Sequence, residues 1–179
     1  MANRWKGLVC GALGGMLATY VMGRYNAATA PAVSKLNEVL APCRLPPALD
    51  SISLVGQQHE EGETARAAAG RIVYRRLSGA EPQTDETRQL LGEMTYWTYG
   101  CLLGAIYGAC HAPWRSAIGS GLGYGAAAWL IGSETAVPLL GLSEGPGRTP
   151  CGTHVNRAAG HLVYGLTMAL TTSALEHSL

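Results

Sequence analysis

The chain has 179 residues, a formal net charge of +1 and 47% hydrophobic residues, which favours one domain. The near-neutral charge, without basic residues interleaved with aromatic ones, argues against nucleic acid as a partner. No Walker loop, GxSxG elbow or other catalytic motif is present, so we expect a non-enzymatic protein without a cofactor. The five cysteines, an odd number, have neither metal-site nor disulfide spacing.

The charged residues are distributed unevenly along the chain. Residues 7–23 and 158–175 contain no Asp, Glu, Lys or Arg, whereas residues 24–89 are rich in them. Apolar runs of this length can cross a hydrocarbon core about 30 Å thick, at about 1.5 Å per helical residue. We therefore predict an all-α polytopic membrane protein, a single membrane domain over residues 1–179 with helices at about 7–25, 85–110, 116–141 and 158–175.

The first predicted helix, residues 7–25, follows Arg4 and Lys6, an arrangement shared by signal peptides and first membrane helices. The best small-residue cleavage pattern, at residues 28–30, is followed by Pro31, which disfavours cleavage, so we expect a retained helix. Glycines at four-residue spacing give it a face that another helix can approach closely: Gly7, Gly11 and Gly15.

The polar insertion, residues 26–84, contains prolines that we expect to break it into short pieces: Pro31, Pro42, Pro46 and Pro47. Residues 60–78 have a helical pattern, with a face made mostly of alanine and with Arg71 and Arg75 opposite. Such a helix can lie among lipid headgroups with its arginines toward anionic lipid, or it can pack against its own protein. The sequence favours these two alternatives equally.

The second and third predicted helices each carry one acid on a face of small residues. In residues 85–110, the α-helical period places Glu93 on the face of Gly100, Gly104 and Gly108. In residues 116–141, the same period places Glu134 on a small-residue face, and we read the glycines there as helix packing: Gly119 and Gly123. Both acids are therefore expected to point into the bundle.

Four ionisable residues are predicted to lie on one side of the membrane. Glu93 comes early in the second helix, Glu134 late in the third, His161 early in the fourth, and His154 just before it. With alternating helix directions, the two glutamates and His161 fall in the same leaflet, one to two turns below the surface, and His154 lies in the preceding loop on that side. They form a candidate proton- or ion-linked cluster. The alternatives are a structural role for each group, which the sequence favours, and metal or haem ligation, for which the histidine and cysteine spacing is weak.

Segments of all four helices resemble one family. The chain is similar to the YagU-like family of bacterial inner-membrane proteins through GLxxGxxGG in the first helix, YGCLLGAIYG in the second, LGYGAAAWLIGSETAVPLLGL in the third and HVNRAAGHLVYGL in the fourth. The resemblance implies a small multi-pass inner-membrane protein with a link to acid tolerance. It implies no catalytic residues, and the polar insertion matches no pattern of the family.

We therefore predict a membrane protein, with the lipid bilayer as its partner, whose Glu/Glu/His cluster responds to pH. One alternative is a transporter or channel subunit that uses Glu93 and Glu134 as an ion path; it would be a homo-oligomer, because four short helices enclose little space. A second alternative is a structural or assembly partner. The orientation is open: Arg4 and Lys6 favour a cytoplasmic N-terminus, but arginines also flank the spans on the other side.

Overall fold

The computed structural model describes residues 4–110 and 116–178, and within them the chain is helical, without a strand. The elements are α1 (Arg4–Val39), η1 (Pro47–Leu49), α2 (Ala65–Ser78), α3 (Asp85–Cys110), α4 (Ala117–Ala127), η2 (Ala128–Ala136), α5 (Val137–Leu139), η3 (Pro146–Arg148) and α6 (Cys151–Ser178). The predicted turn between the second and third helices, residues 111–115, lies outside the described residues.

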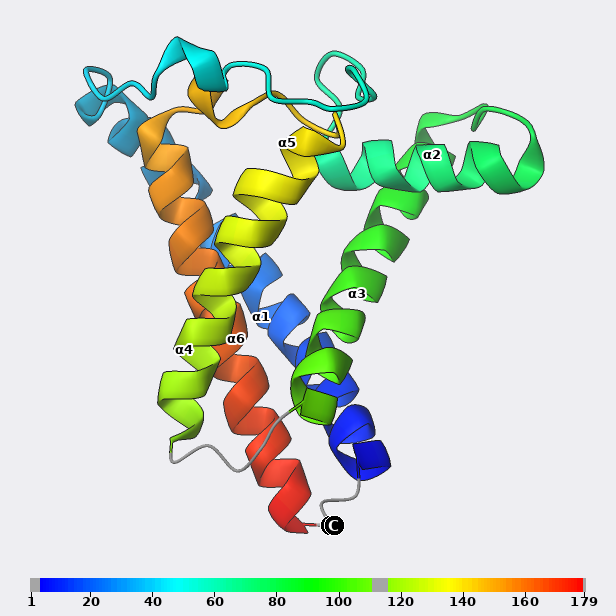
Figure 1. Cartoon of the computed structure of the whole chain (residues 1–179), viewed down its shortest axis with the longest axis vertical. Coiled ribbons are helices and arrows are strands. Elements are labelled where there is room, and N and C mark those ends of the chain that lie inside the picture. The colour runs from blue at the N-terminus through cyan, green and yellow to red at the C-terminus, as the bar shows by residue number, and fades with distance from the viewer. Residues whose placement is uncertain (1–3, 111–115, 179) are drawn as a thin grey trace.

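Figure 1 shows α1, α3, α6 and the continuous α4–η2–α5 segment running along the long axis of the molecule. Helix α1 packs against α3 on one side and α6 on the other, and α4 packs against α6. Helix α2 and the connecting loops lie across one end of these helices. We call this layer, residues 40–84 and 140–150, the cap.

Helices α1 and α3 pack backbone to backbone through glycine. A Cβ atom added to Gly11 would collide with the carbonyl oxygen of Gly104, and one added to Gly108 would collide with that of Gly7. The glycine faces predicted for the first two helices thus meet each other, in antiparallel register: Gly7 with Gly108, Gly11 with Gly104, and Gly15 with Gly100. This contact is possible only without side chains at these positions.

Helix α1 is longer than predicted and continues through Pro31 to Val39. Proline removes one backbone hydrogen bond, but the residues beyond it pack against α6, which itself begins at Cys151 rather than near residue 158. Gly152 contacts Asn37, and the Asn37 side-chain amide donates to the Thr153 hydroxyl at 3.1 Å. This tertiary contact accompanies the extension of α1 into the region that the prolines were predicted to break, and the earlier start of α6.

Large apolar side chains lie mainly on the outside of the bundle, and small residues lie inside. Among the described residues, the largest fully buried side chains are Met168, Thr19, Thr172 and Cys10. Exposed apolar residues occur on every long segment, among them Leu13, Leu17, Leu102, Ile106, Ile118, Leu130, Ile131 and Leu170. Of the described helices, α1 alone is long and apolar enough, judged singly, to cross a membrane. A helix of this kind also occurs in soluble proteins and in signal sequences.

Candidate functional site

The third predicted helix contains a π-helical segment, η2, which carries Glu134. The indole Nε1–H of Trp129 donates to Glu134 Oε1 at 2.9 Å, and the Thr135 hydroxyl donates to the carbonyl of Leu130 at 2.8 Å. Both bonds join residues five apart. Such residues lie on different sides of an α-helix, but a π-helical turn brings them onto the same side. The π-helix therefore supplies Glu134 with its indole donor.

Glu134 and His154 form a close pair at the cap end of the bundle. Glu134 Oε2 lies 2.8 Å from His154 Nδ1, and the two side chains are only 10% and 13% exposed. The other ring nitrogen, Nε2, lies 3.0 Å from the carbonyl oxygen of Pro146. A carbonyl oxygen only accepts, so Nε2 carries a hydrogen.

The short Glu134–His154 contact requires a second proton, either on His154 Nδ1 or on the carboxyl group. In the first case the pair is an imidazolium and a carboxylate; in the second, a neutral imidazole and a carboxylic acid. In both cases Glu134 and His154 share one proton. Loss of that proton would leave the lone pair of His154 Nδ1 facing a carboxylate oxygen of Glu134. This proton-sharing pair is the chemical centre of the candidate site.

His161 lies beside this pair without bonding to it directly. Its Nδ1–H donates to the carbonyl of Arg157 at 2.8 Å, and its Nε2 pairs with the hydroxyl of Ser133 at 3.1 Å. Ser133 precedes Glu134 in η2, so the two histidines contact neighbouring residues of one segment. Among the candidate residues, the structure thus brings together Glu134, His154 and, through Ser133, His161.

Glu93 does not belong to this cluster, contrary to the prediction. Its carboxylate pairs with Arg66 of α2 at 3.1 Å and is about half-exposed, at 46%. Arg66 also stacks over the Tyr96 ring, 5.2 Å from its centroid. The prediction went wrong because α2 packs across the beginning of α3 and provides Glu93 with its own cation.

The packing face predicted for the third helix is also wrong. Gly119 approaches only its own cap residue, Ser116, and a Cβ atom on Gly123 would meet nothing within 4 Å. The glycines that contact α6 are Gly121 and Gly125. A π-helical residue advances less around the axis than an α-helical one, so counting back from Glu134 with the α-helical period reaches the wrong face.

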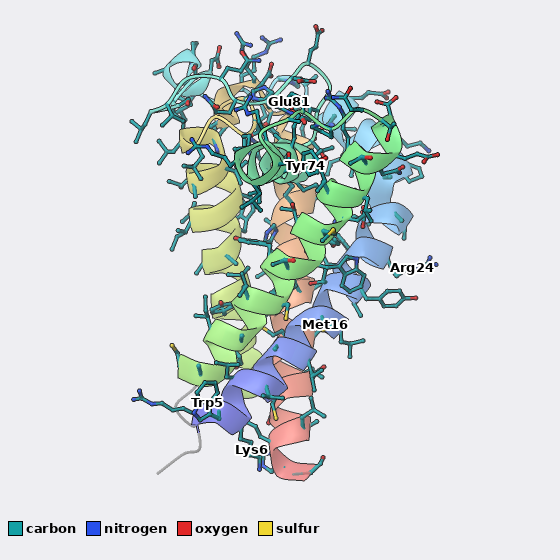
Figure 2. All side chains as sticks on the ribbon, turned by 90° about the vertical axis from the view of Figure 1, so that its right-hand side faces the viewer. Trp5, Lys6, Met16, Arg24, Tyr74 and Glu81 are labelled. Atoms are coloured by element: carbon teal, nitrogen blue, oxygen red, sulfur yellow. A yellow bond between two sulfur atoms is a disulfide. The ribbon has the colours of Figure 1, made fainter. Side chains whose placement is uncertain are left out.

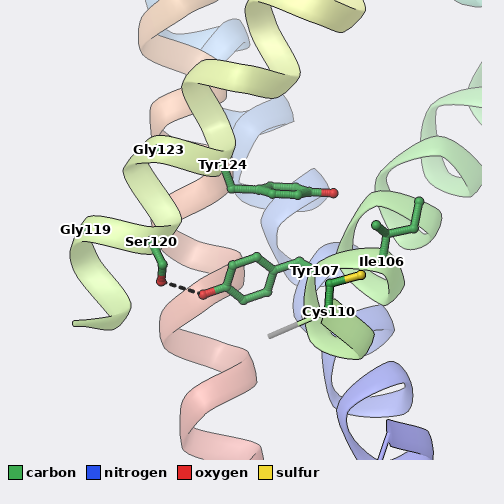
Figure 3. A pocket seen from close by; sticks show the side chains of 7 residues that line it. All are labelled: Ile106, Tyr107, Cys110, Gly119, Ser120, Gly123 and Tyr124. Atoms are coloured by element: carbon green, nitrogen blue, oxygen red, sulfur yellow. Dashed lines mark hydrogen bonds between the residues drawn. The ribbon is translucent and has the colours of Figure 1, made fainter. Parts of the chain in front are cut away.

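Gly119 and Gly123 instead line a mostly apolar pocket of about 290 Å³ between α3 and α4 (Figure 3). Its other lining residues include Ile106, Cys110 and Tyr124. Figure 3 shows the Tyr107 hydroxyl meeting Ser120 across this space, at 2.8 Å. Glu134 and His154 are not among the described residues that line this pocket, and none of those residues is an acid or a histidine.

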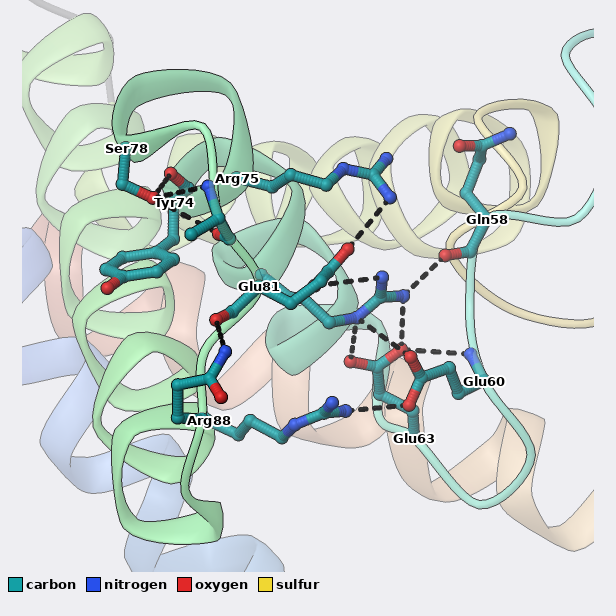
Figure 4. Close-up of polar contacts among 11 residues, drawn as sticks. Gln58, Glu60, Glu63, Tyr74, Arg75, Ser78, Glu81 and Arg88 are labelled. Carbon is teal, nitrogen blue, oxygen red and sulfur yellow. Dashed lines mark hydrogen bonds and ion pairs between the residues drawn. The ribbon is translucent and has the colours of Figure 1, made fainter.

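A second polar centre lies in the cap around Arg71, and Figure 4 shows its partners Gln58 and Glu63. Its guanidinium, 6% exposed, donates from Nε and Nη2 to the two oxygens of Glu63, at 2.9 and 2.8 Å, and from Nη2 to the carbonyl of Gln58 at 2.7 Å. Further ion pairs join Arg75 with Glu81 and Arg88 with Glu60. Of the two alternatives for this arginine-bearing helix, the structure favours packing against its own protein.

The Arg71–Glu63 pair changes the pKa of both groups. The guanidinium hydrogen bond lowers the pKa of the Glu63 carboxyl, against a smaller opposing effect of burial. The same hydrogen bond raises the pKa of Arg71. Both groups are therefore held in their charged forms.

A disulfide joins Cys43, after α1, to Cys151 at the start of α6. Two of the five cysteines therefore pair, although their spacing in the sequence did not indicate it. The bond spans 108 residues, a separation that matches no local motif. It fixes the first turn of α6, which carries His154. It also makes Cys151 unavailable as the thiolate ligand that zinc requires.

The residues that sequence reasoning missed are Trp129, Ser133 and Pro146, whose carbonyl orients His154. No sequence signal identifies them, because the five-residue spacing of Trp129 and Glu134 indicates a contact only if the segment is π-helical. Comparison with known protein families, curated proteins and solved structures finds no match to this chain. The candidate site is therefore interpreted from its own geometry.

Proposed function

We propose that the chain is a small, non-enzymatic, multi-pass membrane protein that binds and releases a proton at its Glu134–His154 pair, and so responds to the pH on the cap side. The membrane part rests on the inverted packing of the bundle, with glycine inside and large apolar residues outside. Beside one small buried cluster around Tyr164 and Met168, such helices gain stability from close backbone contact, as in lipid. The YagU-like resemblance, with its link to acid tolerance, stays a prediction.

Four segments are proposed to cross the bilayer: α1, α3, the α4–η2–α5 segment and α6. The α4–η2–α5 segment, residues 117–139, carries one charged residue, Glu134, but is divided by its π-helix into shorter pieces. On α1, Lys6 and Arg24 bound an uncharged stretch about 26 Å long at about 1.5 Å per residue. Figure 2 shows Arg24 projecting outward and Trp5 and Lys6 at the lower end.

These boundaries put the proton-sharing pair at the membrane surface rather than one to two turns below it. His154 precedes Arg157 on α6, and the uncharged part of that helix begins only at Ala158. An ionisable pair costs less free energy there than in hydrocarbon. The pair would then exchange protons with the aqueous phase on the cap side.

A binding site is favoured over the transporter or channel alternative by the hydrogen bonds further along the bundle. The Tyr164 hydroxyl donates to the carbonyl of Gly100 at 2.6 Å, and the Tyr124 hydroxyl to that of Leu103 at 2.7 Å. Thr172 donates to its own helix. In the described part of the chain these hydroxyls are therefore engaged with backbone acceptors rather than linked into a chain that could relay protons.

The disulfide supports an orientation. Disulfides form in compartments such as the bacterial periplasm and are rare in the reducing cytosol. The Cys43–Cys151 bond therefore favours a periplasmic cap. Arg4 and Lys6 lie at the opposite end, where the positive-inside rule favours the cytoplasm. The proton-sharing pair would then respond to external pH in a bacterial inner membrane.

The test is a pH titration of the protein in lipid vesicles by infrared spectroscopy. The protonated-carboxyl band of wild-type protein should change with external pH, and that change should be absent in Glu134→Gln. Bacteria that depend on the protein for survival in acid should lose that survival with Glu134→Gln. The matched control is Glu93→Gln, an acid that pairs with Arg66 instead. Wild-type acid survival in cells that contain normal amounts of folded Glu134→Gln protein would reject the proposal.

A further inference from the structure

We infer that α2 is an in-plane membrane helix that inserts Val73 and Leu77, on the side facing the bundle, into the lipid interface. Two of its four arginines, Arg71 and Arg75, face away from lipid. This inference rests on the proposed membrane location and adds a lipid contact outside the spans. It reverses the sequence-based hypothesis, in which Arg71 and Arg75 reach for anionic lipid.

The first support is the height at which α2 crosses α3. Gly70 packs on the backbone of Leu91, and Gly92 approaches Ala67. From Gly92 to Cys110, α3 is about 27 Å long at about 1.5 Å per residue. A hydrocarbon core is about 30 Å thick. The contact therefore places α2 at the boundary between hydrocarbon and headgroups.

The second support is the side of α2 on which its exposed apolar residues lie. Val73 and Leu77 follow Gly70 by three and seven residues, so they share the face that packs on α3. Figure 1 shows the C-terminal half of α2 extending beyond α3, which leaves this face uncovered. Val73 is 57% exposed and Leu77 is 85% exposed. Both side chains therefore point away from the cap, toward the side on which the spanning helices lie.

The third support is that the opposite face is occupied by the cap. Arg71 is buried against Glu63, and Arg75 pairs with Glu81 at 3.0 Å. Figure 2 shows Glu81 above α2, whereas Tyr74 follows Gly70 by four residues and so shares the face toward the bundle. Fixed ion pairs on one side prevent the helix from rotating its apolar residues into the cap. The side presented to lipid also carries Tyr74, a residue type enriched at membrane interfaces.

The flanking residues fit a lipid surface better than a protein partner. Arg66 reaches Glu93 and Tyr96, which fixes the N-terminal half of α2 to α3. Arg76, beside the apolar residues, is exposed and long enough to extend its guanidinium to a phosphate. Near the level of this crossing, α3 also carries exposed apolar residues, Leu90 and Met94. One lipid layer would cover these residues of α3 and the exposed face of α2.

The experiment measures where residue 77 lies in vesicles of mixed zwitterionic and anionic phospholipid. Cys10, Cys101 and Cys110 are replaced by alanine, the disulfide is kept, and a nitroxide is attached to Leu77→Cys. Leu54→Cys is the matched control, because Leu54 is 80% exposed in a cap loop. At residue 77, collisions with oxygen should exceed those with a water-soluble nickel chelate, and at residue 54 the order should reverse.

Water-like accessibility at residue 77 overturns the inference, and so does spin–spin broadening there, which would indicate a second copy on this face. If the variant with the three alanine substitutions does not fold, Leu77→Trp in the wild-type chain is used instead. Brominated lipid should quench the fluorescence that the new tryptophan adds. Unquenched emission from that tryptophan overturns the inference. Flotation of wild-type protein with vesicles separates the two proposals. Protein that does not float rejects the membrane location, whereas protein that floats with residue 77 in water rejects only the role of α2.

Discussion

Trp129 and Glu134 are joined by a hydrogen bond of 2.9 Å between residues five apart, and this bond exists because the helix is π-helical there. The indole donor satisfies one carboxylate oxygen and leaves the other to His154. π-helical turns are rare in proteins and often occur at functional sites. The bond thus connects a local irregularity of the backbone to the only close Glu–His pair among the described residues.

The indole bond can be removed by Trp129→Phe, which keeps an aromatic ring at this position. Hydrogen bonds to charged groups contribute roughly 1.5–3 kcal/mol, so we expect a free energy of unfolding lower by about 2 kcal/mol. Denaturant unfolding in detergent measures this. Trp97→Phe, on the outer side of α3, is the control and should change stability by less than about 1 kcal/mol. Equal effects of the two changes would contradict a specific Trp129–Glu134 bond.

Two glycine substitutions should have opposite effects. Gly104→Ala drives a methyl group into the backbone of Gly11 and should separate α1 from α3, costing about 3 kcal/mol or more. Gly123→Ala adds a methyl group into open space, so helix propensity alone should stabilise the protein by up to about 1 kcal/mol. Thermal unfolding of both variants compares them directly. A destabilising Gly123→Ala would mean that Gly123 packs against a neighbour after all.

The cap should lose stability in acid through Glu63. Because Arg71 holds the pKa of Glu63 below its ordinary value, the pair stabilises the fold above the unfolded pKa of about 4.3. That contribution is lost as the pH falls through the lower, folded pKa. Glu63→Gln should therefore destabilise by about 2 kcal/mol at pH 7, and the difference should vanish in strong acid. Unfolding across this pH range tests it, with Glu61→Gln at an exposed position as the control.

The disulfide should contribute substantially to stability. Opening a bond across a loop of this length typically costs about 2–5 kcal/mol. Cys43→Ser and Cys151→Ser should each lower the unfolding temperature, and wild-type protein should reach the same value in a reducing agent. If the reducing agent also destabilises the Cys43→Ser variant, its effect does not come from this bond.

The orientation predicts which thiol a reagent can reach. Cys110 is exposed at the end of α3 opposite the cap. In intact cells a membrane-impermeant maleimide should leave Cys110 unlabelled, and it should react after permeabilisation. A cysteine introduced at the exposed cap residue Leu54 should react in both cases. Labelling of Cys110 in intact cells would reverse the orientation.

The sequence was informative wherever one helix period applied over a whole segment. Helix α3 has the bounds predicted for the second helix, and its glycine face meets that of α1. A side chain at any of these positions would keep the two backbones apart, so a four-residue glycine repeat by itself predicts a close contact between helices. The all-helical class followed from the same periodicity.

The tertiary structure decided what depends on contacts distant in sequence or on departures from the α-helix. The π-helix rotated Glu134 relative to Gly119 and Gly123, the cross-contact of α2 removed Glu93 from the predicted cluster, and packing on α6 carried α1 past Pro31. The Cys43–Cys151 bond belongs to the same group. Periodicity describes the face of one helix, whereas hydrogen bonds, ion pairs and disulfides between segments form only where the folded chain brings their atoms within a few ångströms.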